Sequence, residues 1–198
     1  MTRDRIAGVV LAAGPSRRFG THPPKQLAIF DGQPLVRRIV EVALASRLSE
    51  VVVVLGLAGA AVAEELGGLE VRLIDNPGFR QGQSSSVRAG LAAVADRVSA
   101  AMFVPIDQPG LSTVAIDSLI DCYRQSAASI VVPTFAGQRG APVVIDQSLF
   151  GELAAIEGDA GGRQIFARHE ENLVELAFAR EEPLLDVDTP DQLAALES

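Results

Sequence analysis

The chain has 198 residues, of which 48% are hydrophobic, 17 are Lys or Arg and 25 are Asp or Glu. This length suits one domain over residues 1–198, and the net charge of −8 argues against general binding to nucleic acid, which usually needs a basic surface. The single cysteine, Cys122, allows no intrachain disulfide and fits a cytoplasmic location, and no apolar run approaches the roughly 20 residues that span a membrane.

Short apolar runs alternate with helical patterns along the chain. Strands are expected at residues 6–12, 50–55, 69–74, 100–105, 129–133, 173–177 and 184–187, with a further apolar run at 142–145. Helices are expected at residues 34–47, 58–66, 84–95, 114–125, 147–156, 162–168 and 190–196. The alternation predicts an α/β, Rossmann-like fold with a mainly parallel sheet and helices on both faces. Ligands of such sheets bind at the carboxyl ends of the strands.

The first expected strand runs into the segment LAAGPSRRFG, which has glycines at both ends and arginines inside. Gly14 and Gly20 let backbone N–H groups approach an anion closely. Basic side chains that can bind phosphate oxygens follow within this stretch: Arg17, Arg18 and Lys25. The spacing matches neither the P-loop, because five residues separate the two glycines, nor the dinucleotide fingerprint. The segment therefore indicates a phosphate-binding loop, with a turn that holds no ligand as the alternative.

Two later segments place carboxylates at the ends of expected strands. FVPIDQPGLS brings Asp107 into a turn, and LLDVDTPDQL carries Asp186 and Asp188. Mg²⁺ prefers oxygen ligands and often takes only one or two carboxylates from a protein, so Asp107 can bind it and Asp188 can supply a second ligand. The alternatives are a turn-forming role for Asp107 and capping of the last helix by Asp188 or Thr189.

Three glycine-containing segments complete the set of candidates. In NPGFRQGQSSSVRAGL, Gly82 precedes a serine cluster that includes Ser86 at an expected helix start, where free N–H groups can bind an anion or the serines can act as ordinary caps. The loops GQRGAPVVI and GDAGGR carry Arg139 and Arg163. Either arginine can meet the phosphate of a second substrate, or either loop can be a plain surface turn.

Taken in order, these segments make the chain resemble the small nucleotidyltransferases of molybdenum-cofactor maturation, in particular their CTP:molybdopterin cytidylyltransferase branch. The likeness runs over nearly the whole chain and implies the nucleotide-diphospho-sugar transferase type of α/β fold. It implies that Arg17 and Lys25 bind phosphates, that Asp107 is the main Mg²⁺ ligand and that Asp188 is the second. It also implies a nucleotide-binding set made up of Leu11, Ala12, Ala13, Gly14, Arg17, Lys25, Gly82 and Ser86.

The reaction that the resemblance implies is attack by an acceptor's terminal phosphate on the α-phosphorus of CTP, with release of pyrophosphate. A phosphate monoester is already anionic near neutral pH, so catalysis reduces to positioning and charge stabilisation by Arg17, Lys25 and Mg²⁺ on Asp107. The implied partners are CTP and a phosphorylated pterin, and a molybdoenzyme partner is compatible with the resemblance.

Two departures from the relatives leave the acceptor open. Gln108 stands where relatives usually have Met, and Ala141 stands where they usually have His on the acceptor side. The alternatives are therefore GTP or another nucleotide, a different phosphorylated acceptor, or a protein that delivers a cofactor without catalysis. A NAD-dependent oxidoreductase is a weaker alternative, because the dinucleotide fingerprint is absent.

Overall fold

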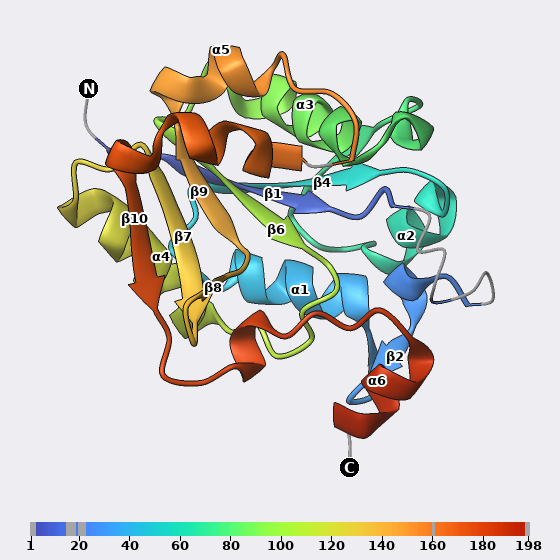
Figure 1. Cartoon of the computed structure of the whole chain (residues 1–198). Coiled ribbons are helices and arrows are strands. Elements are labelled where there is room, and N and C mark those ends of the chain that lie inside the picture. Colours follow the sequence, from blue (N-terminus) through green and yellow to red (C-terminus); the bar gives the residue numbers. More distant parts are fainter. Residues whose placement is uncertain (1–2, 15–18, 20–22, 160, 197–198) are drawn as a thin grey trace.

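The computed structural model describes residues 3–14, 19, 23–159 and 161–196, and its centre is an eight-stranded sheet (Figure 1). In spatial order the strands are β10 (Leu173–Ala177), β7 (Ile130–Phe135), β9 (Val143–Asp146), β6 (Ala100–Pro105), β1 (Ile6–Leu11), β4 (Glu50–Leu55) and β5 (Arg72–Asp75), with β8 (Gln138–Arg139) paired to β7. A separate two-stranded hairpin consists of β2 (Ile29–Phe30) and β3 (Gln33–Pro34).

Within the eight-stranded sheet the parallel pairs outnumber the antiparallel ones, as the alternation of strands and helices predicts. β1 pairs in parallel with β4 and β6, β4 with β5, and β7 with β10. β8 is antiparallel to β7, and β9 is antiparallel to both β6 and β7 and separates them. Since β9 enters from the β8 hairpin rather than from a crossover helix, it runs against its neighbours.

Helices cover both faces of the sheet (Figure 1). One face carries α1 (Leu35–Leu44), α2 (Gly59–Glu65) and α4 (Thr113–Gln125), and the other carries α3 (Gln83–Val94) and α5 (Phe150–Leu153). The last helix, α6 (Pro190–Leu196), lies beside the β2–β3 hairpin. Side chains of β1 alternate between the two resulting cores: Ile6 and Val10 pack with the α1 side, and Ala7 and Val9 with the α3 side.

Two glycines allow close approaches around β1. A Cβ atom on Gly90 of α3 would lie 2.2 Å from Val9 Cγ1 and 3.0 Å from Val54 Cγ2, so α3 lies on the sheet at a distance that only glycine permits. A Cβ atom on Gly56 would lie 2.2 Å from the Ala13 carbonyl oxygen. The turn after β4 therefore lies directly against the backbone that leaves β1.

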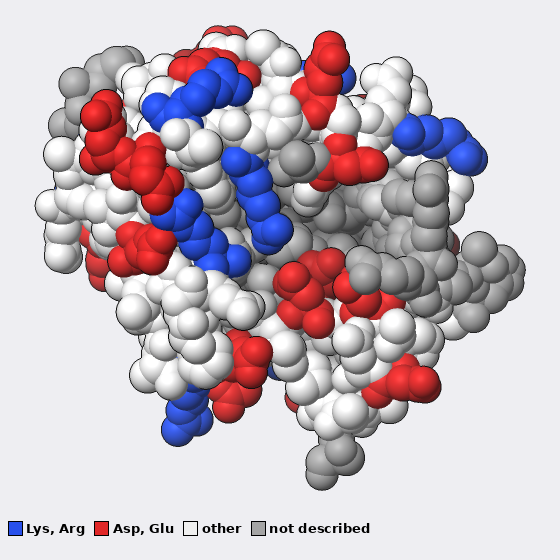
Figure 2. Space-filling model, in the orientation of Figure 1, with Lys and Arg blue, Asp and Glu red and all other residues white. Residues whose placement is uncertain are grey.

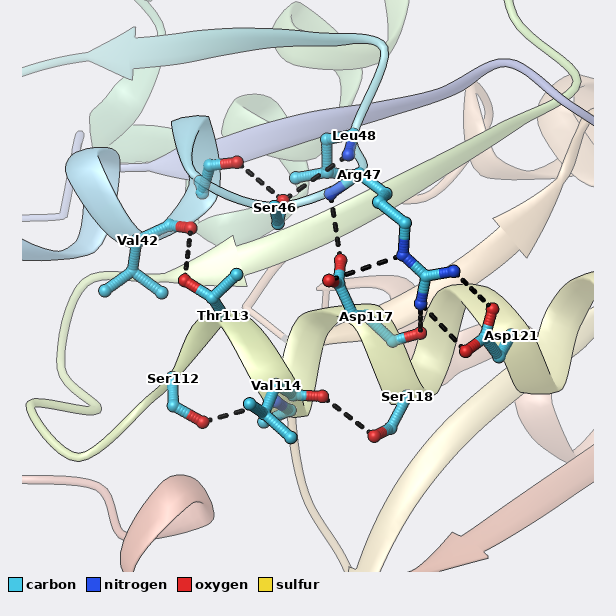
Figure 3. Close-up of polar contacts among 12 residues, drawn as sticks. Val42, Ser46, Arg47, Leu48, Ser112, Thr113, Val114, Asp117, Ser118 and Asp121 are labelled. Atoms are coloured by element: carbon cyan, nitrogen blue, oxygen red, sulfur yellow. Dashed lines mark hydrogen bonds and ion pairs between the residues drawn. The ribbon is translucent and has the colours of Figure 1, made fainter.

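Arg47 connects α1 to α4 at the end of the sheet where β4 begins (Figure 3). Its guanidinium lies 2.8 Å from an Asp121 carboxylate oxygen and 3.3 Å from one of Asp117, and its backbone N–H donates to Asp117 at 2.8 Å. Hydrogen bonding from Arg47 lowers the pKa of Asp121. Thr113 adds a hydrogen bond to the Val42 carbonyl at 3.3 Å, so the two helices are joined through polar groups as well as through the core.

Three late segments differ from the sequence expectation. Residues 184–187 form no strand; a short 3₁₀ helix, Glu182–Leu184, is followed by chain outside the sheet, anchored where Val187 N donates to the Asp107 carbonyl at 2.8 Å. In place of a helix over 147–156 there is a 3₁₀ turn, Gln147–Leu149, followed by the four-residue α5. Residues Gly161–Arg168 are 3₁₀ rather than α, next to glycines with positive φ at 158 and 161. No helix in the described part of the chain is both long and apolar enough to span a membrane.

Candidate functional site

A cavity of about 570 Å³, here called the cleft, opens at the carboxyl ends of β1 and β6. Figure 2 shows acidic side chains gathered beside a hollow in the middle of this face, with basic side chains across from them. The residues that line the cleft are Leu11, Ala13, Gly14, Lys25, Gln26, Phe79, Arg80, Gln81, Gly82, Gln83, Ser86, Pro105, Ile106, Asp107, Asp159 and Asp188. The cleft thus lies where the topology of a parallel sheet predicts a ligand site.

Lys25 brings two carboxylates together in the cleft. It begins a 3₁₀ turn, is only 4% exposed, and its Nζ lies 2.9 Å from Asp107 Oδ2 and 3.4 Å from Asp188 Oδ1. A buried ammonium group needs such partners, because an unpaired charge in the protein interior is strongly unfavourable. The end of β6 and the segment before α6 therefore meet at one cation.

The donor set fits a divalent cation. Both carboxylates reach a common point, which Nζ of Lys25 takes in this structure, and hard cations prefer carboxylate oxygen. Within the described ranges no group of three or more His, Cys, Asp or Glu side chains is placed to hold a metal. A Mg²⁺ ion here would therefore complete its shell with phosphate oxygens and water, as it commonly does.

Asp186 lies outside this pair and is held by Gln108. Gln108 Nε2 donates to Asp186 Oδ1 at 2.9 Å and to the Leu184 carbonyl at 3.2 Å. Burial, and next the charge of Asp107, raise the pKa of Asp186, while the Gln108 amide acts in the opposite direction. Asp186 does not line the cleft, so of the two aspartates in the DVD segment the geometry favours Asp188 as a metal ligand.

Gln26 supports the backbone that leaves β1. Its side chain is buried, and Nε2 donates to the Ala12 carbonyl at 3.0 Å and to the Gly14 carbonyl at 2.7 Å. Ala12 itself is buried and does not line the cleft, unlike its neighbours Leu11, Ala13 and Gly14. Arg17, and with it Arg18 and Gly20, lies outside the described residues.

Gly82 and Ser86 line the opposite wall of the cleft. Gly82 has φ +103°, and a Cβ atom there would lie 2.6 Å from the Gly158 carbonyl, which also accepts a hydrogen bond from Ser84 N at 3.0 Å. Asn76 Nδ2 donates to the hydroxyl of Ser86 at 3.1 Å and to that of Ser85 at 2.9 Å. The start of α3 is therefore fixed by two other segments, and the serines have structural partners as well as a place in the cleft.

The two candidate arginines of the glycine-rich loops differ in environment. Arg139 is paired with Glu170, and with Glu175 at 2.7 Å, on the surface beside β10. Arg163 has no ion pair in the described part of the chain and lies at a smaller cavity that adjoins the cleft. The structure therefore places Arg163, and not Arg139, beside the site.

Several cleft residues have no counterpart among the individual candidates from the sequence. Gln26, Phe79, Arg80, Gln83 and Asp159 all lie within or next to the motifs used above. Gln26 directly follows Lys25 in the sequence. Only the structure shows that its side chain is buried. Their common position at the cleft depends on contacts between distant segments, which residue spacing does not report.

The fold and the cleft define a nucleotidyltransferase. A MobA-like NTP transferase domain is matched over residues 8–173, and the chain belongs to this family.

Several similar proteins align with 96% or more of the chain, and another aligns with about half of it. Nicotine blue oxidoreductase of Paenarthrobacter nicotinovorans is 35% identical, with 96% of each chain covered. The crystal structure of Rv0371c from Mycobacterium tuberculosis H37Rv is 31% identical with a TM-score of 0.84 and 99% of each chain covered, and a manganese complex of that protein aligns at 30% identity over 97% of each chain with a TM-score of 0.78. A probable molybdenum cofactor guanylyltransferase of Bacillus cytotoxicus is 32% identical over 54% of this chain and 52% of its own length. The α/β fold and the molybdenum-cofactor type of nucleotidyltransferase that the sequence predicts are confirmed.

Proposed function

We propose that the chain is a Mg²⁺-dependent cytidylyltransferase that moves CMP from CTP to the phosphate of a small acceptor and releases pyrophosphate. The observation that carries the proposal is the meeting of Lys25, Asp107 and Asp188 in one cleft at the carboxyl ends of β1 and β6. One ammonium and two carboxylates at such a place suit a metal–triphosphate ligand.

Most of the predicted site residues have a proposed role. Asp107 and Asp188 would hold Mg²⁺, which supplies charge neutralisation on the triphosphate when bound. Lys25 and Arg17 bind phosphate oxygens. Backbone groups of Leu11, Ala13 and Gly14 on one side, and Gly82 with Ser86 on the other, hold the nucleoside end. Ala12 has no direct role in this proposal, because its N–H is bonded to the Val54 carbonyl and its carbonyl to Gln26.

In the proposed reaction an oxygen of the acceptor's phosphate forms a new bond to the α-phosphorus of CTP. The bond from the α-phosphorus to the oxygen that bridges it to the β-phosphorus breaks, and pyrophosphate leaves with that oxygen. No proton needs to be removed from the attacking phosphate, which is already ionised, so the residues act by orientation and by cationic charge. Lys25 would counter the charge that develops on the leaving pyrophosphate.

The acceptor and the base are the finer parts of the proposal. The name of the Bacillus relative, and the family that the sequence resembles, support a phosphorylated pterin as the first acceptor to test. Because the Bacillus relative is named a guanylyltransferase, GTP is the first nucleotide to compare with CTP. We further propose that residues 1–198 act as one domain, since both cores pack on one sheet. We also propose a cytoplasmic location, which the single cysteine favours.

A steady-state assay of pyrophosphate release tests the proposal. Wild-type protein is supplied with CTP, GTP or ATP and with a phosphorylated pterin, with and without Mg²⁺. Asp107→Asn is expected to lower the Mg²⁺-dependent rate about 100-fold or more, while Asp96→Asn, an exposed carboxylate on the surface, keeps the wild-type rate. Wild-type turnover by Asp107→Asn would refute the metal assignment.

A second candidate is favoured by the full-length relative named nicotine blue oxidoreductase. In that case the cleft would hold a reduced nicotinamide nucleotide, and a hydride would pass from its ring to an oxidised substrate that also takes up a proton from water. A thermal-shift series with CTP, GTP, ATP, NADH and NADPH separates the two candidates, because stabilisation by CTP that requires Mg²⁺ supports nucleotidyl transfer. Stabilisation by NADPH alone, with no pyrophosphate release, supports the second candidate.

A further inference from the structure

A second cavity, here called the ring pocket, opens directly beside the cleft. Its volume is about 160 Å³, and Leu11, Gln83 and Pro105 line both cavities. Because three residues are shared walls, a molecule seated in the ring pocket would touch a ligand of the cleft. The ring pocket is therefore placed to receive part of the second substrate.

The buried side chains that line the ring pocket are all apolar, and its polar side chains, Gln83 and Arg163, are exposed. Five buried side chains from α3, β6, β9 and the Gly161–Arg168 segment line it: Val87, Phe103, Val143, Ile145 and Phe166. A hydroxylated chain in such a space would leave polar groups without partners, at a cost of about 1–3 kcal/mol each. A flat hydrocarbon ring would not, and a cavity of roughly 150 Å³ is known to be large enough for benzene.

The rim of the ring pocket is small and positively charged. Gly140, Ala141 and Gly162 carry at most a methyl group there, so the entrance is not closed by side chains. Arg163 lies at the same rim, is exposed, and has no ion pair within the described ranges. Burial raises the pKa of Asp186 most, and the charge of Arg163 is among the effects that lower it, so the two side chains lie near each other.

We propose that the ring pocket binds the single aromatic ring of an anionic acceptor, with the anionic group at Arg163 and the reacting end in the cleft. This rests on the proposed function for the role of the cleft, but ring binding itself does not require a nucleotide. A pterin has ring nitrogens and a carbonyl that the five apolar side chains cannot satisfy, so the ring pocket favours a benzenoid ring over a pterin.

Calorimetric titration of the intact chain tests the ring pocket without nucleotide. The probes are phenyl phosphate, glycerol phosphate and a carboxypterin. Phenyl phosphate is expected to bind at least about tenfold more tightly than either of the others, because only its ring loses apolar surface to water in this pocket without leaving polar atoms unpaired. Equal or tighter binding of glycerol phosphate or of the carboxypterin overturns the proposal.

Two pairs of variants place the binding in the ring pocket. Ala141→Phe fills the rim and is expected to weaken phenyl phosphate at least about tenfold, whereas Ala155→Phe, at an exposed position after α5, leaves its affinity unchanged. Phenol, which has the ring but no anionic group, is a further probe and is expected to bind the wild type more weakly than phenyl phosphate does. Arg163→Gln is expected to remove this difference in affinity, whereas Arg168→Gln, at the end of the same segment, retains it. Unchanged phenyl phosphate affinity in both Ala141→Phe and Arg163→Gln overturns the proposal.

The affinity for CTP in the presence of Mg²⁺ is measured for each variant by the same method. If wild-type protein binds phenyl phosphate but not CTP, the proposed function fails and the ring pocket stands. If wild-type protein binds CTP, and phenyl phosphate binds no better than glycerol phosphate, the ring pocket fails and the proposed function stands.

Discussion

Substitution of Gly90 by alanine sets two effects of opposite sign against each other. In a helix interior alanine is favoured over glycine by about 1 kcal/mol, so propensity alone predicts stabilisation. The new methyl group would lie 2.2 Å from Val9 Cγ1 and 3.0 Å from Val54 Cγ2, both in the buried core. Overpacking a tight core costs about 1–3 kcal/mol, so we expect a net loss of up to about 2 kcal/mol.

The assay is equilibrium unfolding in urea, combined with CTP titration. A loss of 1 kcal/mol lowers the urea midpoint by about 0.3–1 M, since the free energy of unfolding of small proteins falls by about 1–3 kcal/mol per M of urea. The matched control is Gly151→Ala in α5, where no atom lies within 4 Å of the new methyl group, so a gain or no change is expected. CTP binding should weaken only in Gly90→Ala, because a displaced α3 carries Ser86 away from β1. If Gly90→Ala is more stable than the wild type, the inferred close packing of α3 on the sheet is wrong.

Three further changes test other parts of the molecule. Lys25→Met should raise the affinity of the free protein for Mg²⁺ at least about tenfold, measured by calorimetry, because a positive charge 2.9 Å from Asp107 no longer competes; unchanged affinity contradicts this. Gln26→Leu leaves the buried Ala12 carbonyl unpaired at about 1–3 kcal/mol and removes a second hydrogen bond to the exposed Gly14, so urea unfolding should show a clear loss of stability, and wild-type stability would exclude the inferred support of the loop. Asp146 is partly buried, which raises its pKa, but hydrogen bonds from Tyr123 and Ser148 and the charge of Arg3 outweigh this and hold the pKa below its usual value of 3.8. Because that pKa is lower in the folded than in the unfolded chain, the stabilisation is present above pH 3.8 and is lost as the pH falls through the folded value. Tyr123→Phe should therefore move the acid-induced loss of stability to higher pH, and an unshifted acid midpoint would show that the Tyr123 hydroxyl does not hold that pKa down.

Most regular elements of the first two thirds of the chain were predictable because periodicity and burial agree there, but the short β2–β3 hairpin was not predicted. Residues 100–105 are apolar and form β6, and residues 114–125 repeat apolar positions at helical spacing and form α4 within one residue. Residues 142–145 give no sign of direction, since an apolar run reads alike in a parallel and in an antiparallel strand. Residues 184–187 have strand-like composition but lie outside the sheet, because the hydrogen bonds described between them and other segments join Val187, Leu184 and Asp186 to the turn at Asp107 and Gln108 and not to a neighbouring strand.

For the candidate site, the sequence indicated the right segments but not which members of them meet. Arg139 and Arg163 occur in similar loops, and only the three-dimensional positions of Glu170 and Glu175 explain why Arg139 is engaged elsewhere. Asp186 and Asp188 would point the same way on an extended chain, yet Gln108 takes one and Lys25 the other. The roles of the nucleotide-binding residues remain predictions.

The contact between Lys25 and Asp188 joins residues 163 positions apart in the chain. During synthesis on the ribosome, the two strands that carry the cleft emerge well before residue 188 does. A nascent chain therefore has Lys25 and Asp107 but lacks the second carboxylate, and it cannot yet form the complete cation site. Binding of any ligand that needs both carboxylates is consequently postponed until residue 188 has been made.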